Sequence, residues 1–181
     1  MPTTDNIQRF TVNSVPVRGA IVRLNTSLKT VLAQHPYPTA IAELLAEALV
    51  ASLLLSSTIK WQGRFITQYQ GNGALKRLVT QSTHTRTICG MAQWEQPLPK
   101  DTSQLLAYGN LVTSVLQDNA QKPYQSIIPL NPQGLTESIQ DYFLQSEQLP
   151  TQLWISGTLD NVQGMLLQTL PSNDGSFDFN S

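Results

Sequence analysis

The residue types that most often carry chemistry are few in this chain and lie far apart. Cys89 is the only cysteine, and His35 and His84 stand in separate stretches without an HExxH-like partner. A single cysteine excludes an internal disulfide and a metal site built from several cysteines. Cys89 follows Ile88 in a strand-like run, so we expect a small buried side chain there and not a nucleophile. We expect both histidines to be exposed to solvent.

The other catalytic patterns are incomplete. The stretch Gly71–Lys76 has glycines before a lysine, but it lacks the GxxxxGK[ST] spacing and the following helix of a phosphate loop, so it predicts a hairpin turn. Asp141 and Glu147 do not share a face of the helix predicted there, which argues against an acid/base pair. No serine lies in GxSxG. The residues therefore offer no active site, and an enzyme using Cys89 or His84 in an unrecognised pocket is the less favoured alternative.

Aromatic side chains on predicted strands are the other candidates for function. Trp61, Phe65, Tyr69 and Trp94 are large enough to build an apolar binding surface. A place in the hydrophobic core is the alternative for each of them.

One helix must organise the chain. Residues 39–59 read TAIAELLAEALVASLLLSSTI, with Pro38 just before them and no internal Gly or Pro. Thr39 can act as N-cap. Leucine and alanine cover all sides of this helix, which predicts burial on all sides. Its length also suits a membrane, but Glu43, Glu47 and three serines argue for the core of a soluble protein.

The remaining pattern is mostly strands, so we predict an α+β fold in which two β-sheets pack around the buried central helix. One folded domain would span residues 1–170, and residues 171–181 would begin a disordered linker. Thr136 is expected to cap a further helix near the C-terminal end. Helices are predicted over 26–34, 39–59, 102–107 and 137–147. Strands are predicted over 9–13, 17–24, 65–70, 75–80, 85–94, 111–116, 124–128, 153–159 and 165–170, with a loop at 81–84.

The composition limits the classes of partner. The chain has 181 residues, a formal net charge of −1 and only 13% charged residues. It therefore lacks the basic surface that nucleic acid or an anionic membrane would need. The first ten residues, MPTTDNIQRF, have neither the basic start nor the apolar segment of a signal peptide.

Several short stretches resemble one known family. Residues 141–151, DYFLQSEQLPT, are similar to the DYFxxSEQxPT signature of the thirty-three-kilodalton chaperonin family. In the same order along the chain, VRG at 17–19, QGNG at 70–73 and GMLLQ at 164–168 resemble further family motifs, and residues 45–60 resemble the family's central helix. Cys89-Gly90 departs from the expected Arg-Gly. The signature residues are Asp141, Tyr142, Phe143, Ser146, Glu147, Gln148 and Pro150.

The resemblance implies a fold and a function. Members of the family are heat-shock, redox-regulated holdases of the bacterial cytoplasm and some organelles; they bind unfolded client proteins without ATP and tend to form dimers. Their zinc is held by four cysteines in a C-terminal domain that follows the stretch matched here. This chain has one cysteine, so we expect no zinc, no other cofactor and no redox switch within it. The alternative is a structural or dimerisation domain whose client surface lies in the family's linker.

Overall fold

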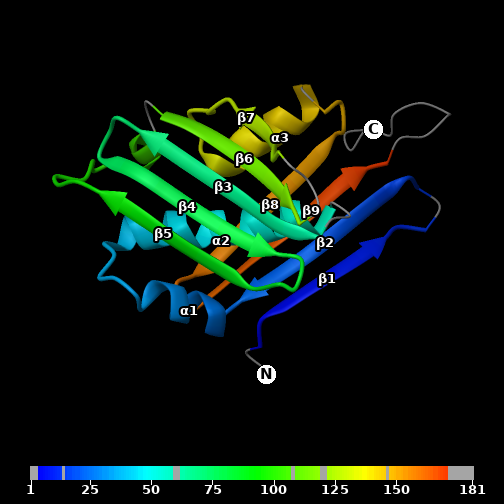
Figure 1. The fold of residues 1–181 in the computed structure, drawn as a ribbon, viewed down its shortest axis with the longest axis horizontal. Helices are drawn as coiled ribbons and strands as arrows, with labels where there is room; N and C mark the ends of the chain where they lie inside the picture. Colours follow the sequence, from blue (N-terminus) through cyan, green and yellow to red (C-terminus); the bar gives the residue numbers. More distant parts are fainter. Residues whose placement is uncertain are drawn as a thin grey trace.

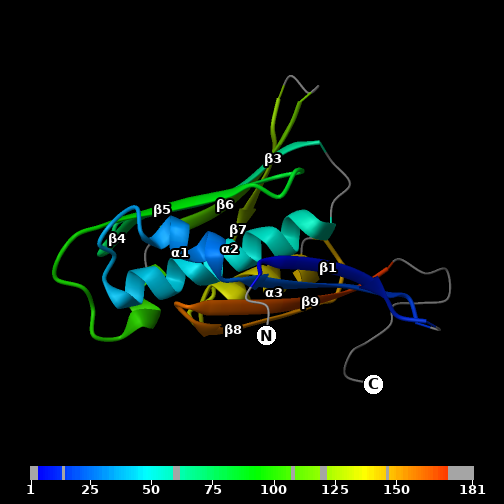
Figure 2. The same cartoon turned by 90° about the horizontal axis from the view of Figure 1, so that it is seen from below.

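Two antiparallel sheets enclose a layer of helices (Figure 1, Figure 2). The structure is a computed structural model that describes residues 4–13, 15–58, 62–106, 109–118, 122–145 and 147–170. One sheet has the strand order β1-β2-β9-β8 and the other β5-β4-β3-β6-β7. The strands are β1 (Asn6–Thr11), β2 (Val17–Leu24), β3 (Gly63–Gly71), β4 (Leu75–Thr83), β5 (Ile88–Trp94), β6 (Gly109–Gln117), β7 (Tyr124–Ile128), β8 (Thr151–Thr158) and β9 (Asn161–Thr169). The predicted α+β class with sheet on both sides of a central helix is confirmed.

Helix α2 (Thr39–Thr58) fills the middle of the molecule. It is buried at 14 of its 20 residues, because both sheets pack their inner faces against it. By length and hydropathy it is the one helix of the described residues that could cross a membrane, yet 72% of its apolar window is buried inside the protein. Thr39 is the first helical residue and not the N-cap, since the carbonyl of Pro38 accepts the first bonds of the helix.

The two sheets meet α2 through different chemistry. On the five-stranded side the hydroxyl of Ser52 bonds Thr67 at 3.0 Å and Thr80 at 2.5 Å, so a buried polar cluster joins helix to sheet. On the four-stranded side Gly164 lies so close that a Cβ there would come within 2.5 Å of Val50 and 2.9 Å of Leu54. A glycine on β9 therefore allows the helix its close approach.

Two other helices share the middle layer. Helix α1 (Thr26–Leu32) buries Leu28 and Val31, and a 3₁₀ turn covers Thr102–Leu106. Helix α3 (Leu135–Gln145) lies beside α2 and packs on β8 and β7 (Figure 2). The expectation that Thr136 caps this helix is wrong. The bonding begins earlier, at the carbonyl of Gly134, and the Thr136 hydroxyl instead donates to the Glu47 carboxylate at 2.8 Å.

Most predicted strands are present, and β2 and β7 have the predicted bounds. The predicted loop at 81–84 is wrong, because β4 continues to Thr83 and the turn follows at His84–Arg86. The residues at this end of the strand are polar, but their backbone pairs with β5 and the Ser82 side chain points into the core. Residues 171–181, predicted as linker, and Ile59 at the predicted helix end lie outside the described residues.

Candidate functional site

The outer face of the four-stranded sheet carries a continuous group of apolar side chains. Each strand points alternate residues outward, and no described element covers that side of the sheet (Figure 2). Ile21, Met165 and Trp154 are direct cross-strand partners in one row. Phe10 and Leu167 flank Gly19 in the next row. We call these five residues, Phe10, Ile21, Trp154, Met165 and Leu167, the outer apolar face.

A glycine of β2 leaves room for the Phe10 ring against the sheet. The ring of Phe10 lies over Gly19, with ring atoms 2.3–2.8 Å from the point where a Cβ would stand. Any larger residue at position 19 would displace the ring. Glycine therefore brings Phe10 flat against the sheet and next to Leu167, which joins the two rows into one surface.

The rim of this face is polar but carries little charge. Arg23 and Gln163 pair in the row beyond Ile21 and Met165, and Gln8 stands at the β1 edge. Trp154 is 47% exposed, the most accessible apolar side chain of the group. Such a surface can bury apolar segments of another polypeptide without a cofactor.

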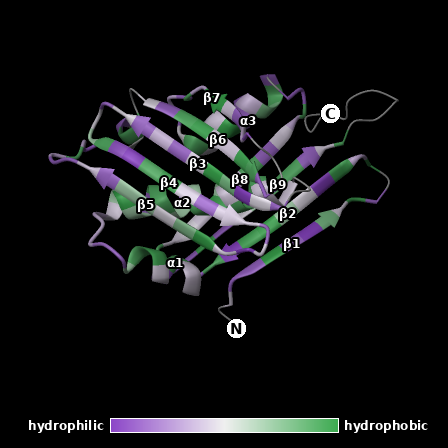
Figure 3. Cartoon of the chain, viewed as in Figure 1, coloured by the Kyte–Doolittle hydropathy of each residue, from purple (hydrophilic) through white to green (hydrophobic). Residues whose placement is uncertain are grey.

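The outer face of the five-stranded sheet is less continuous. Met91 and Ile127 are exposed there, at the two ends of one cross-strand row. The polar Gln68 interrupts this row at its centre, between Val79 and Val112. In Figure 3, hydrophilic and hydrophobic bands alternate along β3 and β4. We therefore place the candidate site on the four-stranded sheet.

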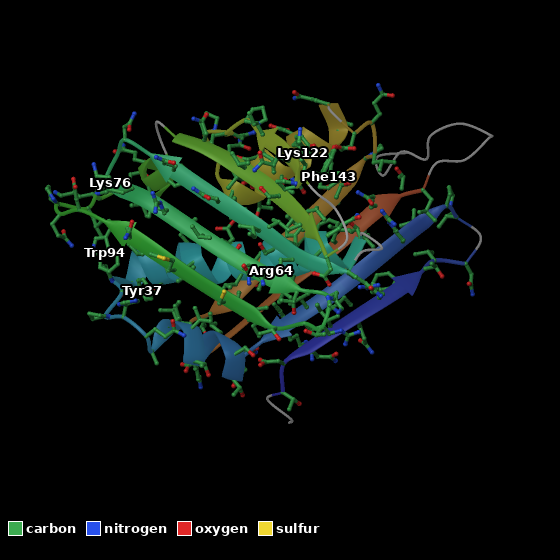
Figure 4. All side chains as sticks on the ribbon, in the orientation of Figure 1. Tyr37, Arg64, Lys76, Trp94, Lys122 and Phe143 are labelled. Carbon is green, nitrogen blue, oxygen red and sulfur yellow. The ribbon has the colours of Figure 1, made fainter. Side chains whose placement is uncertain are left out.

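The residues predicted for an apolar surface lie elsewhere. Phe65 and Tyr69 are 3% and 0% exposed, because β3 turns them toward α2, and the expectation that they form a surface is wrong. Trp94 is half-buried against Tyr37, with ring centroids 5.5 Å apart (Figure 4). Trp61 lies outside the described residues. Phe65, Tyr69 and Trp94 do not belong to the outer apolar face.

The expectation of a buried Cys89 is also wrong. The thiol is exposed on the outer face of β5. Its neighbour Gly90 takes the inward position, 3.1 Å from Leu45 and Leu49 as measured from an ideal Cβ. An exposed thiol reacts whether or not it is catalytic, so thiol titration cannot test for an enzyme here.

Each histidine side chain has a contact among the described residues. His84 accepts the backbone N–H of Gly63 at 3.1 Å, and His35 packs edge-on against Tyr37. Within the described part of the chain, no three His, Cys, Asp or Glu side chains gather closely enough to hold a metal ion.

The signature stretch forms the corner between α3 and β8. Tyr142 donates to Glu147 at 2.7 Å, and burial, helped by that carboxylate, raises the pKa of Tyr142 to about 12. Asp141 accepts from Asn131 at 2.7 Å. Gln148 has a positive φ of 53°, and the carbonyl of Pro150 accepts from the backbone of β9. Phe143 packs against Tyr142, and Ser146 lies outside the described residues.

Comparison with known proteins shows the family. The model of the family described as Hsp33 protein matches residues 5–179. The chain is a member of the Hsp33 family. A 33 kDa chaperonin of Nitrosococcus oceani is 40% identical over 97% of this chain and 61% of its own length. One from Shewanella loihica is 38% identical over 94% of this chain and 60% of its own.

A solved Hsp33 structure has the same fold. The 33 kDa chaperonin of Thermotoga maritima superposes with a TM-score of 0.77 at 25% identity, over 90% of this chain and 60% of that one. The family and fold expected from the signature are confirmed. This chain spans about 60% of the length of these relatives.

Proposed function

We propose that this chain is the client-binding domain of an ATP-independent holdase of the cytoplasm, which keeps unfolding proteins from aggregating and catalyses no reaction. The observation that supports this most is the outer apolar face, five contiguous large apolar side chains that no described element covers, on a sheet of an Hsp33 family member. Unfolding proteins expose apolar segments, and burying them on this face removes both surfaces from water.

The free energy gained by burying apolar surface on this face is consistent with reversible client binding. Burial contributes about 25 cal/mol per Å², so a contact of order 500 Å² supplies on the order of 10 kcal/mol before entropy costs. Ordering a flexible client takes most of that sum, which leaves weak, exchangeable binding. The same surface can also associate with a second copy, so we propose that dimer formation competes with client binding.

The deciding experiment is light scattering of a guanidinium-unfolded test protein diluted into buffer, without ATP and with reductant throughout. The chain should suppress aggregation. Trp154→Ser should weaken suppression several-fold, because it removes the most accessible side chain of the outer apolar face. Met91→Ser, 37% exposed on the other sheet, is the matched control and should change little.

High salt should leave suppression in place, since salt screens charges and not apolar contacts. Absence of suppression at a several-fold molar excess would refute the proposal. It would favour the alternative, a structural or dimerisation domain whose longer form binds clients elsewhere. Equal losses of aggregation suppression in both variants would show that the client surface is not confined to the four-stranded sheet.

We further propose that the zinc-dependent redox switch of the family resides in the part of a longer protein that this sequence does not contain. Cys89 alone cannot hold a structural zinc ion, which takes four ligands. We expect no stoichiometric zinc by elemental analysis of the purified chain. Hydrogen peroxide should leave aggregation suppression unchanged, and Cys89→Ser should behave like the parent chain; peroxide activation abolished by Cys89→Ser would contradict this.

A further inference from the structure

A groove on the opposite side of the four-stranded sheet from the outer apolar face has no role in the proposed function. It opens between β7 and α3, at the C-terminal end of α2, and encloses about 500 Å³. Its apolar walls come from Leu55, Phe65, Val115 and Phe143, which belong to four different elements. Phe143, which is labelled in Figure 4, comes from α3. A volume of this size is typical of sites for small molecules.

Among the described residues that line the groove, Arg18 is the cation. The Nε and Nη2 of Arg18 both donate to a single oxygen, Oε1 of the buried Gln168. Gln168 in turn donates to Thr151 at 2.9 Å, which fixes the amide in place. Neither the Lys29–Asp160 nor the Lys76–Glu95 salt bridge involves Arg18, whose described polar partner is the neutral amide of Gln168.

A guanidinium in this setting favours an anion. It has five N–H groups, and a neutral amide oxygen leaves several of them for another acceptor. Burial lowers the pKa of Arg18, which indicates that its charge is incompletely compensated. A carboxylate can take two parallel N–H bonds from this planar group and restore the compensation.

The acidic residue at the same groove does not supply that compensation. Glu147 is exposed to solvent and already accepts the hydroxyl of Tyr142 at 2.7 Å. Water and salt screen an exposed carboxylate far more than they screen a half-buried cation. The groove thus combines apolar walls with one cation that no described carboxylate neutralises.

The groove also gathers three of the stretches that identify the family. Arg18 belongs to the VRG stretch, Gln168 to GMLLQ, and Tyr142 and Phe143 to the signature stretch. Among the described residues, these side chains otherwise share only the hydrogen bonds around Gln168 and the packing at the corner of α3. None of them belongs to the outer apolar face.

We propose that this groove binds a small anionic amphiphile, a fatty acid or similar apolar chain that ends in one carboxylate. The carboxylate would bind Arg18, and the chain would lie along Phe143, Val115 and Phe65. A fatty acid suits the site better than a peptide, because the exposed surface that lines the groove is mainly apolar and Arg18 is the cation among its described lining residues. The proposal is independent of client binding.

The test is isothermal titration calorimetry of the purified chain with sodium decanoate below its micelle concentration. Decanoate should bind one to one, and decylamine and 1-decanol should bind at least tenfold more weakly. Arg18→Gln should weaken decanoate binding at least tenfold. Arg23→Gln on the same strand points to the opposite face and should leave binding unchanged.

A second variant guards against misfolding of Arg18→Gln. Ser126→Phe places a ring in the groove from edge strand β7 and keeps every charge, so it should block decanoate while circular dichroism stays native. Equal binding of decanoate and decanol, or decanoate binding that survives Ser126→Phe, would overturn the proposal. So would tighter binding by a short apolar peptide with a free C-terminus than by decanoate, since the occupant would then be a polypeptide end. Trp154→Ser should not alter any of these values.

Discussion

At the scale of single residues, Leu49 shows how strongly α2 depends on its packing. Its side chain is 1% exposed and lies against Gly90 of β5. We predict that Leu49→Ala lowers the free energy of unfolding by about 2–5 kcal/mol, because lost burial adds to the cavity left behind. Urea denaturation followed by circular dichroism measures this. Gln145→Ala, at an exposed position of α3, should stay within about 0.5 kcal/mol of the parent chain.

Residue burial was predictable in α2 and not in the strands next to it. In α2 nearly every side chain is apolar, so any rotation of the helix buries the same kinds of residue. In β3, Phe65 and Ile66 are neighbours of similar hydrophobicity, and in β5 Cys89 and Gly90 are both small. Which member of each pair faces the helix depends on how the sheet is placed, and a strand's own pattern does not contain that information.

At the scale of elements, a half-buried carboxylate joins α2 to α3. The Glu47 side chain accepts the hydroxyl of Thr136 at 2.8 Å. Burial raises the pKa of Glu47 above its ordinary value of 4.5, with a smaller contribution from Glu137, and the Thr136 bond offsets part of that rise. The folded state therefore favours the protonated form of Glu47 more than the unfolded state does.

The sign of the pH effect follows from this raised pKa. As the pH rises from about 4.5 through the folded pKa, the folded chain must give up a proton it holds more tightly, so this group's contribution to stability is lost. We predict that Glu47→Gln unfolds at a higher temperature than the parent chain at pH 7.5. The difference should shrink as the pH falls toward 4.5. A difference that stays constant across this range would contradict the raised pKa.

Element bounds followed from local signals where those signals were strong. Pro38 marks the start of α2, and Pro123 and Pro129 bracket β7. The turn between β4 and β5 was misplaced because polar residues such as Gln81 and Ser82 read as loop. In the sheet they pair with Cys89 and Ile88, and this pairing across the hairpin decides where the strand ends.

At the scale of the whole molecule, both sheets depend on one helix. β2 and β9 contact α2 from one side, and β4 and β5 from the other. We predict a single unfolding transition. Two single-tryptophan variants test it, one keeping Trp154 on β8 and the other Trp94 on β5. Their fluorescence midpoints in urea should agree with each other and with circular dichroism. Separate midpoints would show that the sheets unfold independently.

Neither the outer apolar face nor the groove could be predicted from the sequence. The face needs Phe10 and Leu167 to meet across Gly19, and the groove needs Arg18 near Phe143. Such pairs depend on strand order and register, which join parts of the chain far apart in the sequence. The family signature located the fold, since it covers a corner that the fold requires, but it did not locate the surface.

The strand order β1-β2-β9-β8 also has a consequence for how the protein is made. Leu24, near the start of the chain, pairs with Val162, near the end of the described residues. A ribosome adding about 5–20 residues per second needs on the order of ten seconds to travel from one to the other. During that interval β2 lacks its neighbour β9, and the apolar side of α2 that β9 will cover stays open to solvent. A protein proposed to protect unfolding chains thus passes through a long vulnerable stage of its own during translation, and nascent chains stalled before β9 should be its most aggregation-prone form.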